Sequence, residues 1–197
     1  MDAHEIPSKD PLEWFDTWLK QAEESEPNDP NAAALATATR DGAPSVRMVL
    51  AKRIGPHRFC FFTNAESRKG LELADNPRAA LCFHWKTLRR QVRVEGGVSA
   101  LGKRDVDRYF HSRPRASQIG ATVSDQSRVL ASREDLEERV RIFGEQHPGE
   151  IPRPSFWQGF YLSAEHIEFW IDGANRLHDR FLFTRRGHLW QKARLYP

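Results

Sequence analysis

The chain has 197 residues, enough for one domain with a sizeable hydrophobic core. Hydrophobic residues make up 39% and charged residues 29%, as in soluble globular proteins, and no apolar run approaches the roughly 20 residues that a membrane helix needs. The net charge of +3 is too small to indicate a dedicated nucleic-acid-binding protein. Arginines spread along the chain instead favour bidentate binding of small phosphates or carboxylates.

The N-terminal part of the chain predicts a helix and no secretory signal. The opening sequence, MDAHEIPSKDPLEW, lacks the basic and then apolar pattern of a signal peptide, so we expect a cytoplasmic protein. Over residues 10–24, Leu12, Phe15 and Trp18 recur at helical spacing behind Asp10, a candidate N-cap. This pattern predicts an amphipathic helix.

Residues 33–101 have the pattern of short barrel strands with one short helix among them. A turn at Asp41 and Gly42 joins two apolar runs, which is a typical hairpin signal. In RRQVRVEGG, Val92 and Val94 alternate with polar residues, as in a strand with one buried face. The connections are too short for parallel crossovers, so we expect antiparallel pairing.

Residues 102–148 predict a helical segment, in which one helix stops at Pro114 and a later one begins near Ser127 or Ser132. After a proline-marked linker, residues 156–197 alternate again between apolar and polar positions. They predict four C-terminal strands, two of them in the runs FWQGFYLSA and HIEFWID.

Residues 1–197 together predict a single domain, mainly β with peripheral α-helices, whose antiparallel strands form a closed or partly closed barrel. No GxGxxG turn follows a strand, so a Rossmann dinucleotide site is not expected. The two cysteines, Cys60 and Cys82, lie in apolar runs without CxxC or Cys/His spacing. This indicates two free core thiols and no metal site.

The stretch SVRMVLAK is the first candidate for chemistry. In an extended strand, Arg47 and Val49 face one way, while Met48, Leu50 and Lys52 face the other. An arginine inside an apolar strand is costly unless it has a partner. It either binds a ligand or partner there, or is an ordinary charge on an edge strand.

Ser67, Arg68 and Lys69 stand at the expected start of a helix. Free N–H groups and the positive end of the helix dipole favour an anion at this position, and the two cations would strengthen it. The stretch therefore predicts a phosphate-binding site, with an ordinary exposed basic turn as the alternative.

Tyr109, Arg113 and Ser117 recur at four-residue intervals, although Pro114 interrupts a continuous helix. Two hydroxyls and a guanidinium could hold a second phosphate. The alternative is a helix end with a salt-bridged arginine. Gln126 and Ser127, further on, would by themselves indicate only a helix cap.

The segment RLHDR ends the series. If it is extended, Arg176, His178 and Arg180 face one way, and Leu177 and Asp179 the other. This geometry disfavours a His–Asp catalytic dyad between sequence neighbours. A single histidine between two cations also disfavours a metal site. We therefore expect a face that binds an anion or a ring, and a structural role for Asp179 beside a neighbouring cation.

These stretches, in this order, closely resemble the pyridoxine/pyridoxamine 5′-phosphate oxidases. The resemblance rests on RMVLAK (47–52), FTN (62–64), SRKG (67–70), RRQVRVEG (89–96), YFHSRPRASQIGA (109–121), DQS (125–127), EFW (168–170), RLHDR (176–180) and RLYP (194–197). It implies an FMN-binding split β-barrel and a homodimer with FMN at the interface.

The resemblance also implies residue roles. FMN would contact Arg47, Met48, Val49, Leu50, Lys52, Phe62, Thr63, Arg68, Lys69, Gln91, Gln126, Ser127, Trp170 and Arg180. The substrate would contact Lys52, Tyr109, Arg113, Ser117, Arg176, Leu177 and His178. Catalysis would rest on Arg176, which orients the substrate, and on His178, which assists and could move a proton near neutral pH.

The implied reaction is the FMN-dependent oxidation of pyridoxine 5′-phosphate and pyridoxamine 5′-phosphate to pyridoxal 5′-phosphate, a step of vitamin B6 salvage or biosynthesis. O2 would be reduced to H2O2, and the amine substrate would release ammonia. The alternatives are a phenazine-type split-barrel flavin oxidase and a non-catalytic split barrel that binds flavin or haem.

The chain departs from the family pattern at three places. Ile171 and Asp172 follow Trp170, where the family usually has Gln-Gly, and Thr122 replaces a common tryptophan. The segment MDAHEIPSKDP lacks the arginine and tyrosine that close over the substrate in many members. We therefore expect altered flavin contacts beside Trp170 and a lid closure that is weaker or absent.

Overall fold

The structure is a computed structural model that describes residues 10–197. Residues 1–9 lie outside the described residues, and they include most of the N-terminal segment in which neither a signal peptide nor the lid arginine and tyrosine were expected. Within the described part, no helix is long and apolar enough to cross a membrane.

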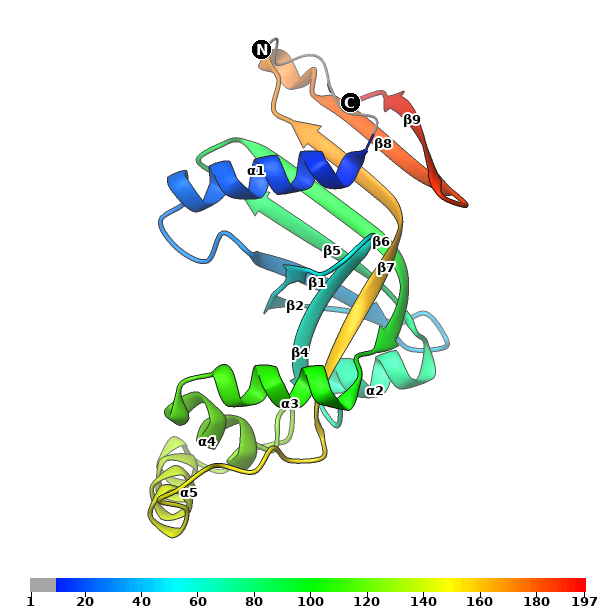
Figure 1. Ribbon diagram of the computed structural model, residues 1–197. Coiled ribbons are helices and arrows are strands. Elements are labelled where there is room, and N and C mark those ends of the chain that lie inside the picture. Colours follow the sequence, from blue (N-terminus) through cyan, green and yellow to red (C-terminus); the bar gives the residue numbers. More distant parts are fainter. Residues whose placement is uncertain (1–9) are drawn as a thin grey trace.

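Nine strands of the described chain form one curled antiparallel sheet, which confirms the predicted class (Figure 1). The strands are β1 (Ala32–Ala38), β2 (Pro44–Leu50), β3 (Lys52–Arg53), β4 (Arg58–Asn64), β5 (Arg78–Trp85), β6 (Arg90–Ala100), β7 (Trp157–Ile171), β8 (Asp179–Arg186) and β9 (Leu189–Leu195). Their order is β2-β1-β5-β6-β7-β4-β3, and the β8–β9 hairpin joins the sheet along β7. The sheet therefore leaves β2 as one edge.

Helices surround the sheet. They are α1 (Pro11–Ser25), α2 (Arg68–Asp75), α3 (Lys103–Ser112), α4 (Arg115–Val123) and α5 (Arg133–Gln146), with a 3-10 turn, η1, at Ala174–Arg176. Figure 1 shows α3, α4 and α5 gathered at the end of the molecule opposite to β8 and β9. Helix α2 lies toward the α3 end.

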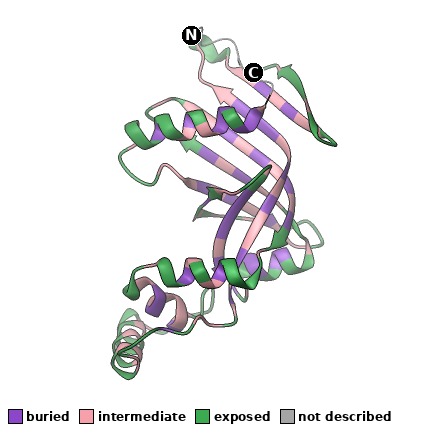
Figure 2. Cartoon of the chain, viewed as in Figure 1, coloured by how far each residue is buried: buried purple, intermediate pink, exposed green. Residues whose placement is uncertain are grey.

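Helix α1 covers the main core, and its formation follows from its sequence. Asp10 caps it by accepting a hydrogen bond from the Leu12 backbone N–H at 2.9 Å. Its buried face places Phe15 against Phe59, with ring centres 4.9 Å apart, and Trp18 against Phe169 at 5.2 Å. Figure 2 shows the buried residues on this face of α1 and along the strands beneath it.

Strand β7 is the main departure from the predicted elements, because one strand of 15 residues replaces the two expected. Its pairing with β6 shifts between Glu95, opposite His166, and Gly96, opposite Ala164. Glu165 is the extra residue of a β-bulge, which bends the strand without ending it. The break seen in the sequence pattern is thus a change of register within one strand.

A second, smaller apolar cluster attaches the helices to the sheet. Val106 and Phe110 of α3 pack with Ile119 of α4 and with Trp157, the first residue of β7. Since Trp157 lies opposite Asn64 at the end of β4, this cluster fixes α3 and α4 beside the β4–α2 connection. That arrangement brings several of the predicted site residues together.

Candidate active site

The start of α2 forms a buried polar cluster around Lys69. The Lys69 side chain is 8% exposed, and its Nζ donates to Thr63 Oγ1 at 3.1 Å, Ser67 Oγ at 3.0 Å and Gln126 Oε1 at 2.8 Å. Burial, with the nearby charge of Arg47, lowers the pKa of Lys69 to about 8. The structure thus brings four residues of the predicted cofactor set close together.

Gly70 lets α2 begin this close to the preceding turn. A Cβ atom at Gly70 would lie 2.1 Å from the backbone oxygen of Ala65, well inside contact distance. The backbone oxygen cannot move aside as a flexible side chain could. The glycine of the SRKG motif is therefore required by the close packing of α2 on its own N-terminal turn.

Glu72, which sequence reasoning missed, holds the cations of this cluster. Its carboxylate is 4% exposed and accepts from Thr37 Oγ1, from Ser45 Oγ at 2.5 Å, and from Arg68 Nε at 2.9 Å, while Arg47 Nη2 lies 3.4 Å away. Burial alone would raise the pKa of Glu72, but these hydrogen bonds and the Arg47 charge lower it to about 2. The helical spacing of Arg68 and Glu72 was the one available sequence signal.

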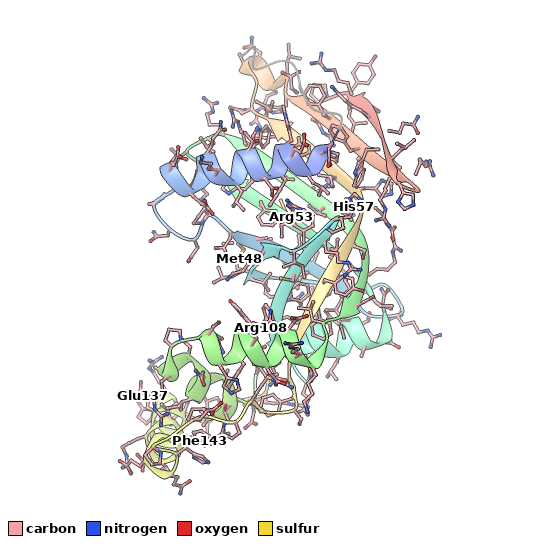
Figure 3. All side chains as sticks on the ribbon, in the orientation of Figure 1. Met48, Arg53, His57, Arg108, Glu137 and Phe143 are labelled. Carbon is pink, nitrogen blue, oxygen red and sulfur yellow. The ribbon has the colours of Figure 1, made fainter. Side chains whose placement is uncertain are left out.

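Strand β2 has the two faces that its sequence predicted. Arg47 points inward, where Nη1 donates to Leu35 O at 3.0 Å, while Met48 and Leu50 are 63% and 51% exposed. Met48 is labelled in Figure 3. Although β2 is an edge strand, Arg47 is therefore a partnered, half-buried charge, and the opposite face of the edge strand is apolar and open.

An aromatic stack connects the predicted substrate cations. The Phe62 ring stacks on Tyr109, with centres 3.9 Å apart, and on Trp157 at 5.4 Å. Lys52 Nζ lies 4.8 Å from the Tyr109 ring centre, and the Arg113 guanidinium lies 5.2 Å from that of Trp157. One cation thus lies against the Tyr109 ring and the other against the Trp157 ring.

Beside this stack lies a cavity of about 320 Å³. Its lining includes Arg113 and Ser117 of the predicted substrate set and Thr63 and Gln126 of the predicted cofactor set. Arg113 Nη1 is buried without a hydrogen-bond partner. Since buried donors are usually satisfied, an acceptor such as a phosphate oxygen fits this position.

Three further residues of the predicted cofactor set form a row across the sheet. Gln91 of β6 lies opposite Trp170 of β7, which lies opposite Arg180 of β8. Arg180 Nε donates to Glu168 Oε1 at 2.8 Å, and Arg93 Nη2 donates to the other oxygen of Glu168 at 2.6 Å. Glu168 is 3% exposed, so a buried carboxylate holds Arg180 at the end of the row.

The prediction that Arg176 lies in an extended segment is wrong. Asn175 and Arg176 adopt positive φ values of 55° and 64° in η1, and β8 begins only at Asp179. Gly173 permits this turn, because a Cβ there would lie 2.1 Å from Leu177 O. Arg176 and Leu177 are exposed, and they do not share strand faces with Arg180 as the alternation had predicted.

The His178 side chain does pair with an aspartate, but with Asp172 and not with its sequence neighbour Asp179. Its Nδ1 lies 3.2 Å from Asp172 Oδ1 and accepts from the Gly173 N–H at 3.1 Å, and its ring lies 4.6 Å from Trp170. Asp179 instead pairs with Arg194 at 3.3 Å, which confirms its expected structural role. Asp172, which the sequence showed only as a departure from the family, therefore contributes to the site.

Within residues 10–197, no group of three or more His, Cys, Asp or Glu side chains could hold a metal ion. Cys60 is buried and Cys82 is half-buried, and both are free thiols, as predicted. Burial raises the pKa of both thiols, which makes them poor nucleophiles.

The fold is that of the split-barrel proteins. The structure superposes on PhzG from Burkholderia lata 383, solved with tetrahydrophenazine-1-carboxylic acid, with a TM-score of 0.92, 29% identity and coverage of 100% of this chain and 97% of that one. An FMN-binding protein of Nostoc punctiforme shares the fold, with a TM-score of 0.77, 15% identity and coverage of 96% of this chain and 100% of that one.

Two family models match this chain and identify its family within the split-barrel proteins. Residues 19–143 match "Pyridoxamine 5'-phosphate oxidase", and residues 157–197 match "Pyridoxine 5'-phosphate oxidase C-terminal dimerisation region". The pyridoxine/pyridoxamine 5′-phosphate oxidase of Gluconobacter oxydans is 54% identical over 95% of this chain and 94% of its own length. That of Sinorhizobium fredii is 52% identical over 100% of both. The chain belongs to the pyridoxine/pyridoxamine 5′-phosphate oxidase family, and it forms a homodimer.

Proposed function

We propose that this protein oxidises pyridoxine 5′-phosphate and pyridoxamine 5′-phosphate to pyridoxal 5′-phosphate, with bound FMN as the immediate oxidant and O2 as the final one. The family and its oxidase relatives support a flavin enzyme that acts on B6 vitamers. The observation that carries the proposal is an excess of cations in two places. Arg47, Arg68 and Lys69 lie around the buried carboxylate of Glu72, and Arg113, which lines the cavity, has a buried donor without a partner.

The Lys69 cluster fits the phosphate of FMN. Arg47, Arg68 and Lys69 would bind it, since one buried carboxylate leaves two positive charges uncompensated. Gln126 and Thr63, which already contact Lys69, would turn their polar atoms toward the same ligand. When bound there, FMN supplies a two-electron acceptor that O2 can reoxidise.

The row Gln91–Trp170–Arg180 fits the flavin ring, but in one protomer it lies far from this cluster. Figure 1 places α2 near one end of the molecule and β8 near the other. We therefore infer that each FMN lies at the dimer interface, with the Lys69 cluster of one protomer and the row of its partner. The apolar outer face of β2, with Met48 and Leu50 exposed, is available to line that interface.

The substrate phosphate fits the cavity beside the aromatic stack. Arg113 and Ser117 line this cavity and would supply a charge and a hydroxyl, and Lys52 and Tyr109, beside the stack, would add a second charge and a second hydroxyl. Binding at this end would fix the pyridine ring at a set distance, and positioning of this kind lowers a reaction barrier by several kcal/mol.

Arg176, His178 and Leu177 would contact the ring of the substrate. Arg176 is exposed on a turn, so it can orient the ring without first breaking an ion pair among the described residues. His178 Nδ1 faces both a carboxylate and an N–H donor, so it can hold a proton against Asp172 or release it and accept from Gly173. His178 is therefore suited to proton movement beside Trp170.

Anaerobic mixing of the purified flavin-loaded protein with pyridoxine 5′-phosphate tests the proposal. The flavin absorbance should bleach and return when air is admitted, with pyridoxal 5′-phosphate as the product. An oxidised spectrum that never changes would rule out this oxidase activity.

The similarity to PhzG motivates a parallel sample with a reduced phenazine carboxylate. Bleaching by the phenazine alone would assign the chain to that reaction instead. The 52–54% identity to B6 vitamer oxidases, against 29% to PhzG, favours the vitamer.

A further inference from the structure

Arg113, which lines the cavity, and Lys52, on β3 beside the aromatic stack, lie over aromatic rings and not against carboxylates. Among residues 10–197, no Asp or Glu side chain lies within ion-pair distance of Lys52 or Arg113. Each instead lies over a ring face, Lys52 over Tyr109 and Arg113 over Trp157. By contrast, Arg47, Arg68 and Arg180 all have acidic partners. Neither Lys52 nor Arg113 is therefore neutralised by a carboxylate of the described residues.

Trp157 is fixed firmly enough to hold Arg113 in place. Its side chain is 5% exposed, lies nearly parallel to Phe62 at 13°, and packs edge-on against Phe110 with ring centres 5.0 Å apart. Its backbone N–H donates to Pro154 O at 3.0 Å, and its carbonyl accepts from Arg153 Nη1 at 2.6 Å. The ring is thus restrained through both its side chain and its backbone.

A contact with an aromatic ring leaves the hydrogen-bond donors of a cation free, whereas an ion pair uses them. A guanidinium that stacks on an indole uses its face, so the N–H donors at its edges can still reach an acceptor. A carboxylate partner would use those donors and cancel the charge. Arg113 Nη1 is buried without a partner, which is the arrangement that the ring contact predicts.

We propose that Trp157 is a positioning residue that holds Arg113 toward the cavity and so sets the preference of the enzyme for phosphorylated over unphosphorylated vitamers. Trp157 itself lines the cavity with Arg113 and Ser117, and it had no place in the residue roles implied by the family resemblance. The proposal rests on the proposed function, because it takes the cavity to bind the substrate phosphate.

The test compares Trp157→Leu, which removes the ring face, with Trp157→Phe, which keeps a smaller one. In the flavin-loaded enzyme, Trp157→Leu should raise KM for pyridoxine 5′-phosphate about tenfold, with kcat within about twofold. The dissociation constant of inorganic phosphate, measured by calorimetry, should rise by a similar factor. Trp157→Phe should restore most of both losses, and kcat/KM for unphosphorylated pyridoxine should not change.

Trp85→Leu is the matched control, because Trp85 is a 2% exposed core tryptophan outside the cavity lining. It should lower the melting temperature without changing KM or phosphate affinity. If Trp157→Leu does not fold, Trp157→Met replaces it as a ring-free variant. Equal phosphate affinity in wild type and a folded ring-free variant would overturn the proposal, as would an equal loss for pyridoxine and its phosphate.

The phosphate measurement also separates this proposal from the proposed function. If the wild type oxidises neither vitamer but binds phosphate in a Trp157-dependent way, the reaction is wrong and the role of Trp157 stands. If the wild type oxidises pyridoxine 5′-phosphate and the Trp157 variants match it, the reaction stands and the role of Trp157 fails.

Discussion

Lys69 should make the stability of the flavin-free protein rise with pH. Its pKa falls from the unperturbed value of 10.5 to about 8 in the folded state, because burial disfavours the ammonium form. Between these values the unfolded chain binds a proton that the folded chain does not. Since the slope of the unfolding free energy with pH follows this difference, the folded state gains stability as pH rises from 8 to 10.5.

The size of this gain follows from the shift. A shift from 10.5 to about 8 corresponds to at most about 3.5 kcal/mol, since one pKa unit is worth about 1.4 kcal/mol. The Lys69→Met variant lacks the titrating group, so the wild type should gain this amount relative to the variant over the same pH window. Urea unfolding of both proteins at pH 7, 8, 9 and 10 measures the difference.

Lys20→Met is the matched control, because Lys20 is an exposed lysine on α1. Its unfolding free energy should run parallel to that of the wild type over the whole pH range. If the unfolding free energy of Lys69→Met also ran parallel to that of the wild type, the argument that burial lowers the pKa of Lys69 would be refuted. In excess phosphate, the rise in the unfolding free energy of the wild type should begin at higher pH, because a bound anion favours the charged amine of Lys69.

Four further substitutions test the site. Arg176→Ala should lower turnover strongly while flavin stays bound. Arg180→Ala should instead raise the flavin dissociation constant by about ten- to a hundredfold. If activity assays and flavin titrations gave the opposite pattern, the two residues would have each other's role. Glu72→Gln should remove stability that wild type has above pH 4.5 and loses toward pH 2, so acid unfolding curves of the two proteins should converge near pH 2. Gly70→Ala should lower both melting temperature and flavin affinity, because its Cβ would clash with the Ala65 carbonyl; an unchanged melting temperature would show that the turn adapts.

Local patterns predicted the elements well where one short stretch carries the information. Asp10 caps α1, and Ser132, one of the two serines proposed, caps α5 by accepting from the Asp135 N–H at 3.1 Å. The alternation of Val92 and Val94 correctly identified the buried face of β6. Capping and alternation depend on residues a few positions apart, so the sequence displays them directly.

The prediction for RLHDR was wrong because it assumed strand geometry up to Arg176. The positive φ values of Asn175 and Arg176 arise from a turn whose packing needs Gly173 close to the backbone of Leu177. Non-glycine residues rarely adopt such values without support from surrounding structure. The pattern of residue types contains no record of that support.

The sequence by itself determined the antiparallel β class, the helix caps, the faces of β2 and β6, and, through the order of its motifs, the family. Only the tertiary structure showed that Glu72 binds residues from β1, β2 and α2. It also showed that Asp172 pairs with His178 and that the Arg113 guanidinium lies over the Trp157 ring. These contacts join residues distant in sequence, and their geometry depends on how the whole sheet curls. Strand and helix periodicities act over a few residues, whereas a buried charge is satisfied by whatever the complete fold brings within hydrogen-bond reach.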